Sequence, residues 1–500
     1  MEDDNTVNSH KEIIKATGVF GFAQILKMLV SVIGTKFVAI FLGPVGIGTV
    51  GLLNNTMGII GSVTNFGLNI TGVREVSSAY TDNDEKKFSE RLTVLQRWFL
   101  IVGLFGGMLT ILCSKLLSKW TFGKEENYFW FVILSVNFIL LSISSGRYAV
   151  LQGLRKIKLI AVSNVLSSVS ITLVTVPIYF FFKFNGIIPV ILLSSLISLL
   201  FNLYFTRNIK TIAVNISLSE TIKKGKPLLK VGFLLSINVI FGQICNYIIK
   251  LYLNGNGATS EVLGFYEVSS VVLLTYVGLV FNAMGTDFYP RLIAIKSDDI
   301  KVNQIVNDQI EVGLLIVTPL ISILYLFSPF LIEILYTKSF LDVTLIFKGA
   351  LFAVIIKTII WPLAFIVLAK GQNKLYFKQE LLGDFLNIAI TIVFYRLFGL
   401  VGIGLASILI FTISGIYIYL IVNKNFNFSI RKDTLKILLV SLFIGLLNCI
   451  VVFFMDSPLT TYLILGLLSC LSVFYSYKEL DKRINISSFY AKIRNRIKRH

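Results

Sequence analysis

Residues 13–42, IIKATGVFGFAQILKMLVSVIGTKFVAIFL, decide the fold class of this chain. The run carries only three charged side chains, Lys15, Lys27 and Lys36, and about 20 apolar residues are enough for a helix to cross a bilayer. Of all 500 residues, 55% are hydrophobic and 15% are charged, whereas soluble domains carry about 25% charged residues. The sequence therefore predicts an all-α polytopic membrane protein.

Fourteen apolar segments along the chain are long enough to span a membrane. The connections between them are short, and the longest are 207–228 and 286–309. The segments lie at residues 13–42, 46–71, 92–117, 128–152, 159–182, 186–206, 229–253, 262–285, 310–335, 343–369, 379–397, 400–422, 435–455 and 458–477.

The distribution of Lys and Arg predicts the orientation of these spans, because cytoplasmic loops are enriched in both. With the N-terminus in the cytoplasm, the cytoplasmic loops and ends hold 33 of the 46 basic residues, the opposite side holds six, and seven lie within spans. Both termini are therefore expected in the cytoplasm. The basic tail, 478–499, lacks an arrangement of stacking aromatics, so it favours anionic lipid headgroups over nucleic acid.

A polar stripe recurs along the chain and predicts two lobes. Stripe residues of the first span reappear 219 positions later in the seventh, and those of the fifth span reappear 216 positions later in the eleventh. Since six spans separate each pair, the lobes would be parallel repeats with a substrate site between them. We expect pseudo-symmetric six-helix lobes at 1–210 and 225–424, followed by an added hairpin and basic tail at 425–500. The paired stripe residues are Thr17, Gln24, Lys27, Ser31 and Thr35 with Ser236, Gln243, Asn246, Lys250 and Asn254, and Asn164, Ser168, Thr175 and Tyr179 with Glu380, Asp384, Thr391 and Tyr395.

The scarcity of catalytic side chains argues against an enzyme. The two histidines, His10 and His500, lie near the chain ends, and the four cysteines are far apart. Acid–base chemistry by His and zinc sites of His or Cys are therefore not indicated. A membrane polymerase or ligase would need a large external loop, and the largest expected here, between the third and fourth spans, is short and has no His. We expect no catalytic activity, no metal and no cofactor.

Two lysines are the foremost candidates for a binding site. Lys27 and Lys357 lie near the middle of their spans, where a basic residue costs at least roughly 2.5–3.5 kcal/mol against lipid. Each should face water, an acidic partner or an anionic ligand, and pairing with a carboxylate for structural reasons alone is the alternative. Arg147 and Lys250 are further cavity candidates, although both are near enough to a membrane edge to snorkel.

Uncharged and acidic candidates complete the predicted site. Gln24, Gln243 and Asn246 belong to the stripes, and Asn54 and Asn65 share one face of the second span with several glycines. That face would line a cavity or pack against another helix. Glu267 and Asp384 would either bind a coupling ion or neutralise the lysines, and the sequence leaves both roles open.

Several segments resemble the Wzx-type O-antigen translocases of the polysaccharide-transporter family. The superfamily of that family also contains the multidrug-and-toxin extruders and the lipid II flippase MurJ. The resemblance extends less distinctly to about residue 424. The segments are ATGVFGFAQILK at 16–27, FLGPVGIG at 41–48, FGLNITGVRE at 66–75 and QGLRKIK at 152–158.

The resemblance implies two six-helix lobes around a central cavity that opens alternately to each side. It implies that an undecaprenyl-diphosphate-linked oligosaccharide moves across the bacterial inner membrane, with proton or sodium as the coupling ion and glycan polymerase machinery as a partner. Lys27, Arg147 and Lys357 are the residues here that would hold the diphosphate.

Two alternatives stay open within the same superfamily. Drug extruders carry an acidic residue in the first helix, whereas this chain has lysines there, which favours an anionic substrate. The two extra spans are similar to those of the lipid II flippase, so a peptidoglycan precursor is the first alternative. An ion-coupled drug or small-solute antiporter is the second.

Overall fold

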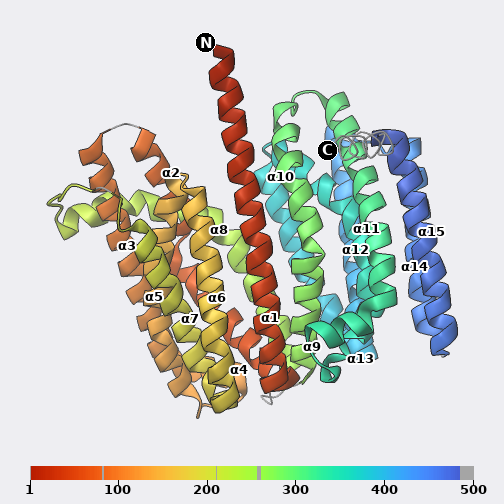
Figure 1. Ribbon diagram of the computed structural model, residues 1–500, viewed down its shortest axis with the longest axis horizontal. Coiled ribbons are helices and arrows are strands. Elements are labelled where there is room, and N and C mark those ends of the chain that lie inside the picture. Colours follow the sequence, from red (N-terminus) through yellow and green to blue (C-terminus); the bar gives the residue numbers. More distant parts are fainter. Residues whose placement is uncertain (1, 82–83, 210, 256–260, 456, 485–500) are drawn as a thin grey trace, which may run out of the picture. The chain divides into compact units, whose positions relative to one another are not determined.

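The computed structural model describes residues 2–81, 84–209, 211–255, 261–455 and 457–484, and every element in these ranges is a helix (Figure 1). The chain divides into two compact units, unit 1 from residues 1–264 with 334–337 and unit 2 from residues 265–333 with 338–500. The lobes predicted at 1–210 and 225–424 and the hairpin and tail at 425–500 stay predictions. Residues 485–500 of that tail lie outside the described residues.

Unit 1 is a bundle in which α5 packs between α3 and α7, while α6 packs against α1 and α7 (Figure 1). Helix α8 packs against α1, α2 and α3. The helices that begin in unit 1 are α1 (Glu2–Asn65), α2 (Leu68–Thr81), α3 (Glu85–Leu112), α4 (Ser114–Phe122), α5 (Tyr128–Gly153), α6 (Ile157–Phe182), η1 (Lys183–Gly186), α7 (Ile187–Thr206), α8 (Leu218–Asn254) and α9 (Glu261–Ser270), the last of which ends in unit 2.

Unit 2 is organised around α12, which packs along α13 and also contacts α10 and α14. Helix α15 packs on α14, so the last two helices form a hairpin. The remaining helices are η2 (Val271–Tyr276), α10 (Gly278–Ala294), α11 (Asp299–Leu335), η3 (Lys338–Phe340), α12 (Val343–Ala369), α13 (Asn373–Phe426), α14 (Lys432–Phe454) and α15 (Pro458–Ile484).

The apolar helices confirm a polytopic membrane protein. Ten described segments are long and apolar enough to cross a membrane, and α8, which bends by 55° between Phe233 and Ser236, is an eleventh. Ile157–Thr206 and Asn373–Phe426 each hold two predicted spans, and Leu26–Asn65 covers part of the first two. Every one of the fourteen predicted spans therefore overlaps described helical structure.

Two glycines break long helices at matching motifs. Gly43 in α1 has φ 63° and Gly399 in α13 has φ 59°, a region that only Gly enters at little cost. Each is the first residue of the sequence G-x-V-G-I-G, at 43–48 and 399–404. Pro44 adds to the first break because it has no N–H to donate. Each break separates two predicted spans.

The helices differ from the predicted spans where hydropathy is a poor guide. The second predicted span, 46–71, is interrupted at Phe66 and Gly67, which have φ 48° and 68° between α1 and α2. The predicted loop 286–309 is largely helical, because α10 continues to Ala294 and α11 begins at Asp299. Hydropathy marks the limits of the apolar layer, whereas a helix continues for as long as its backbone bonds are satisfied.

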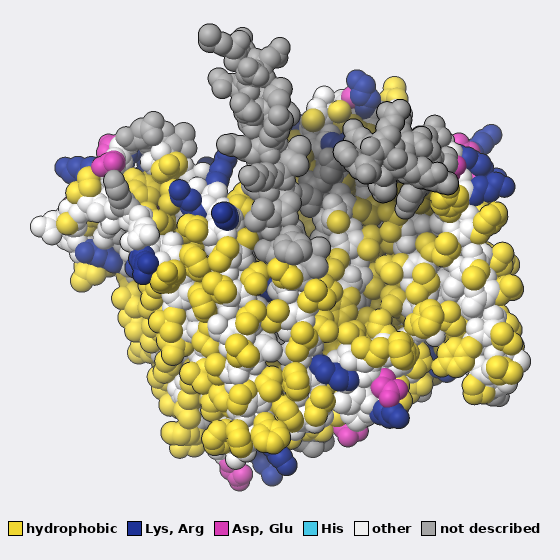
Figure 2. All heavy atoms as spheres, viewed as in Figure 1, with side chains coloured by type: hydrophobic (Ala, Val, Ile, Leu, Met, Phe, Trp, Pro, Cys, Tyr) yellow, Lys and Arg dark blue, Asp and Glu magenta, His cyan; other side chains and the backbone are white. Residues whose placement is uncertain are grey.

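The surface of the helices is suited to lipid. Figure 2 shows hydrophobic side chains over most of the visible face of the described helices, with most Lys and Arg near helix ends. On α3, for example, Leu104, Met108 and Leu112 are 50%, 62% and 72% exposed. Apolar patches of this extent are rare on soluble monomers. On a membrane helix they are favourable, because they lie against acyl chains.

A charged cluster holds the C-terminal hairpin to α11 within unit 2. The Glu311 side chain is only 5% exposed. Its Oε1 accepts hydrogen bonds from Arg431 Nη2 at 3.0 Å and Thr434 Oγ1 at 2.5 Å, and its Oε2 accepts from Arg483 Nε at 2.9 Å. Arg431 also pairs with Asp308, so three helices and the segment before α14 meet here. We name this group, with Glu479, which pairs with Arg483, the Glu311 cluster.

Candidate functional site

Unit 1 contains two neighbouring cavities, of about 660 Å³ and about 380 Å³. We call them the large cavity and the small cavity. Both are lined by Val50, Tyr179, Val190 and Ser194. The two spaces therefore share walls from α1, α6 and α7 and form one polar region.

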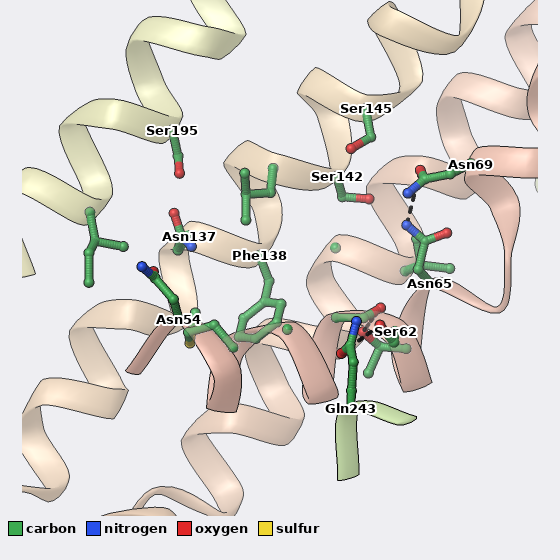
Figure 3. Close-up of a pocket in the computed structure, with 18 of the residues that line it drawn as sticks. Asn54, Ser62, Asn65, Asn69, Asn137, Phe138, Ser142, Ser145, Ser195 and Gln243 are labelled. Atoms are coloured by element: carbon green, nitrogen blue, oxygen red, sulfur yellow. Dashed lines mark hydrogen bonds between the residues drawn. The ribbon is translucent and has the colours of Figure 1, made fainter. Parts of the chain in front are cut away.

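The carboxamides and hydroxyls that line the large cavity come from six helices, α1, α2, α5, α6, α7 and α8, and several of them are labelled in Figure 3. Apolar and glycine residues fill the gaps between them. Among the described residues that line it there is no Lys, Arg, Asp or Glu. The polar lining consists of Asn54, Ser62, Thr64, Asn65, Asn69, Asn137, Ser142, Ser145, Tyr179, Ser194, Ser195, Ser236 and Gln243.

Hydrogen bonds fix part of this lining and leave part of it open. Ser62 Oγ donates to Gln243 Oε1 at 3.1 Å, and Asn65 Nδ2 donates to Asn69 Oδ1 at 3.2 Å (Figure 3). The Oδ1 atoms of Asn65 and Asn137 are buried and have no partner among the described residues. Asn137 is only 3% exposed, and it lies across from Asn54 in Figure 3. Two residues of the lining therefore hold a buried acceptor that no described residue satisfies.

The small cavity lies between α1, α6 and α7 and contains Lys27. Lys27 is half-buried, and no carboxylate of unit 1 in the described ranges lies within 4.0 Å of its Nζ. Predicted stripe residues of the first and fifth spans meet here. They are Lys27, Ser31 and Thr35 from α1, and Asn164, Ser168, Thr175 and Tyr179 from α6.

The structure places the other predicted residues of unit 1 in varied positions. Asn54, Asn65 and Gln243 line the large cavity. Gln24 is exposed on α1, and Arg147 is half-buried on α5. None of the described atoms of these last two lines either cavity.

The stripe of the seventh span is divided between the cavity and helix packing. Ser236 and Gln243 line the large cavity. Asn254 Nδ2 instead donates to the Thr121 carbonyl at 3.0 Å, which joins α8 to α4. Asn246 is half-buried and Lys250 is only 6% exposed, and neither lines a cavity described here.

The remaining predicted residues lie in unit 2. Lys357 Nζ lies 5.6 Å from the ring centroid of Phe281 and 5.8 Å from that of Phe411, within reach of cation–π attraction. Asp384 is half-buried on α13, one turn after Glu380, and Glu267 is half-buried on α9. Across the described part of unit 2, no carboxylate forms an ion pair with Lys357.

Several residues that line the large cavity were not among the predicted site residues. Asn137 is a single carboxamide in the apolar run of α5, and Ser194 and Ser195 interrupt the apolar run of α7. A lone amide in an otherwise apolar span is itself a signal, because its polar group must be satisfied. Among described residues, no group of three or more His, Cys, Asp or Glu could hold a metal ion.

Solved structures with a similar fold are membrane transporters. The lipid II flippase MurJ, in an inward closed conformation, aligns with a TM-score of 0.67 and 17% identity over 93% of this chain and 98% of that one. An inward-facing multidrug resistance MATE family transporter of the MOP superfamily aligns with a TM-score of 0.65 and 15% identity over 80% of this chain and 95% of that one. A MOP superfamily transporter from Pyrococcus furiosus aligns with a TM-score of 0.56 and 15% identity, over 82% and 96%. The chain thus has the fold of these transporters.

Sequence comparison identifies the family. A search of curated proteins finds no match. The sequence profile described as "Polysaccharide biosynthesis protein" matches residues 13–296. This match covers more than half of the chain and includes both cavities of unit 1. The chain is a multi-pass membrane protein that belongs to the polysaccharide biosynthesis protein family.

Proposed function

We propose that this protein is a flippase that moves an undecaprenyl-diphosphate-linked oligosaccharide, an O-antigen or a similar surface-glycan unit, across the bacterial inner membrane. The observation that carries this proposal is the position of Lys27, in a small cavity that shares its walls with a large uncharged polar cavity. A lipid-linked glycan has the same two parts, a charged diphosphate and a hydroxyl-rich sugar. Membership of the polysaccharide biosynthesis protein family supports it.

The residues of the two cavities would bind different parts of the headgroup. The Lys27 ammonium would make charge-assisted hydrogen bonds to the diphosphate, which are stronger than bonds between neutral groups. The carboxamides and hydroxyls of the large cavity would exchange hydrogen bonds with sugar hydroxyls. The polyprenyl tail would stay in the bilayer, against apolar helix faces such as that of α3.

Transport would proceed by alternating access, in which the lobes open the site to one side and then to the other. Both termini would lie in the cytoplasm, as the Lys and Arg distribution predicts. Glu267 and Asp384 stay candidates for proton or sodium coupling, and Lys357 stays a second candidate for the diphosphate. Glycan polymerase machinery and anionic lipids at the cytoplasmic face are the partners that we propose.

A peptidoglycan precursor is the second candidate substrate. The alignment with the lipid II flippase covers 93% of this chain, whereas that with the multidrug transporter covers 80%. The larger coverage favours a lipid-linked substrate over a small drug, because the additional helices have counterparts in a lipid flippase.

The test is a leaflet-accessibility assay in proteoliposomes. Undecaprenyl-diphosphate trisaccharide, and in parallel lipid II, is placed in liposomes with the purified protein, and its exposure on each leaflet is followed with and without proton and sodium gradients. We expect the trisaccharide lipid to change leaflet faster than in protein-free liposomes. If it does not move under any gradient, the proposal is wrong, and movement of lipid II alone would select the second candidate.

A further inference from the structure

The large cavity offers hydrogen bonds without a fixed charge. Five carboxamides contribute to it, and in the described lining no ionisable acid or base of the Asp, Glu, Lys or Arg type accompanies them. A cavity built for a charged sugar would be expected to place an opposite charge beside it, because a buried charge without a partner is costly. The carboxamides are Asn54, Asn65, Asn69, Asn137 and Gln243.

Two of these carboxamides need a donor. The Oδ1 atoms of Asn65 and Asn137 are buried without a partner in the described chain. The orientation of the Asn65 amide is set by its Nδ2, which donates to Asn69 Oδ1 at 3.2 Å. An amide oxygen can only accept a hydrogen bond. If either amide turns its oxygen toward the cavity, sugar hydroxyls and N-acetyl N–H groups can donate to it, whereas a carboxylate, which only accepts, cannot.

Lys27 is the only described cation that lines either cavity, and the proposed function assigns it to the diphosphate. It belongs to the adjoining small cavity, where no other described lining residue is charged. If it binds the diphosphate, no described cation of either cavity is left for an acidic sugar. The small cavity thus provides a cation and the large cavity provides uncharged polar groups, which matches a headgroup whose only charges are on its phosphates.

We infer that the glycan moved by this protein is uncharged, built of neutral hexoses or N-acetylhexosamines, and that unit 1 selects against glycans with carboxylates. This inference rests on the proposed function and narrows its substrate class. It also disfavours the peptidoglycan precursor, whose peptide carries carboxylates.

The experiment compares two lipids that differ at one carbon. An undecaprenyl-diphosphate trisaccharide with a neutral hexose, and its analogue with that hexose oxidised to a hexuronic acid, are assayed in the same proteoliposomes. We expect the neutral lipid to change leaflet about tenfold faster. Equal rates, or a faster acidic lipid, would overturn the inference and leave the flippase proposal standing. If neither lipid moves, it is the proposed function that fails.

A charge placed in the cavity tests the cause of this preference. Asn54 is exposed to the cavity, so a longer side chain can be accommodated there. Asn54→Lys should reduce the neutral-to-acidic rate ratio from about ten to about one, because the new ammonium provides the missing partner. Asn54→Gln keeps a neutral amide and should keep the ratio. A ratio that Asn54→Lys leaves unchanged, in protein that elutes as the wild type does in size-exclusion chromatography, would contradict the inference.

Discussion

In the large cavity of unit 1, the carboxamide oxygens of Asn65 and Asn137 are buried without a described partner, whereas in the Glu311 cluster of unit 2 both oxygens of a buried carboxylate are hydrogen-bonded. Each region is polar and lies among apolar helices. An unsatisfied buried acceptor costs about 1–3 kcal/mol, so a fold tolerates it best where a ligand completes the bond. In the cluster the carboxylate of Glu311 is paired within the chain, and Arg431 Nε is a buried donor there without a described partner. We therefore expect the large cavity to bind a ligand and the Glu311 cluster to stabilise the packing of the C-terminal hairpin on α11.

The largest effect is expected from removing the charge of Glu311. The change Glu311→Gln leaves two arginines without their shared carboxylate. Breaking a fully buried pair costs roughly 3–5 kcal/mol, and we expect about 2–3 kcal/mol here, because Arg431 and Arg483 are 39% and 26% exposed. Thermal or denaturant unfolding in detergent micelles measures this loss of stability.

The control for Glu311→Gln is Asp433, an acidic residue that lines the same surface groove as Glu311. Asp433 is exposed and lines the groove beside Glu311, so Asp433→Asn should change stability by less than about 0.5 kcal/mol. Equal losses for the two variants would show that the pairing of Glu311 is not what holds the hairpin.

The next effect concerns Lys27, the one charged residue in the described lining of the small cavity. Lys27→Ala should slow the movement of an undecaprenyl-diphosphate trisaccharide about tenfold, equivalent to about 1.4 kcal/mol, because a charge-assisted contact to phosphate is lost. Lys27→Arg keeps the charge and should restore most of the rate. The liposome assay measures both variants. Full transport by Lys27→Ala would remove the residue from the binding site.

Hydropathy made most of the fold predictable, because a helix in lipid needs a continuous apolar run. The predicted spans 13–42 and 46–71 leave a gap that contains Gly43 and Pro44, and the structure has its break there. The break at Phe66 and Gly67 was not visible. Nor was the helical structure of 286–294, since no apolar run accompanies it.

The site was predictable only where residues share a helical face. Lys27, Asn54, Asn65 and Gln243 were found from the spacing of polar residues along single helices, and they line the cavities. Partners between distant segments leave no such periodic signal. Glu311 lies 120 residues from Arg431 and 172 from Arg483, so a single sequence does not reveal their pairing.

The smallest effect is expected from Asn137, whose substitution should change transport without lowering stability. Asn137→Leu keeps about the same volume and removes an unsatisfied acceptor, so stability should be unchanged or slightly higher, while transport should fall about threefold to fivefold, near 1 kcal/mol. Asn55 is a matched control, because its Oδ1 is also buried without a described partner but it does not line the cavity. Asn55→Leu should therefore leave transport within about twofold of the wild type. Leaflet accessibility and thermal unfolding of the two variants decide the matter. Wild-type transport by Asn137→Leu would mean that the open acceptors of unit 1 do not bind the glycan.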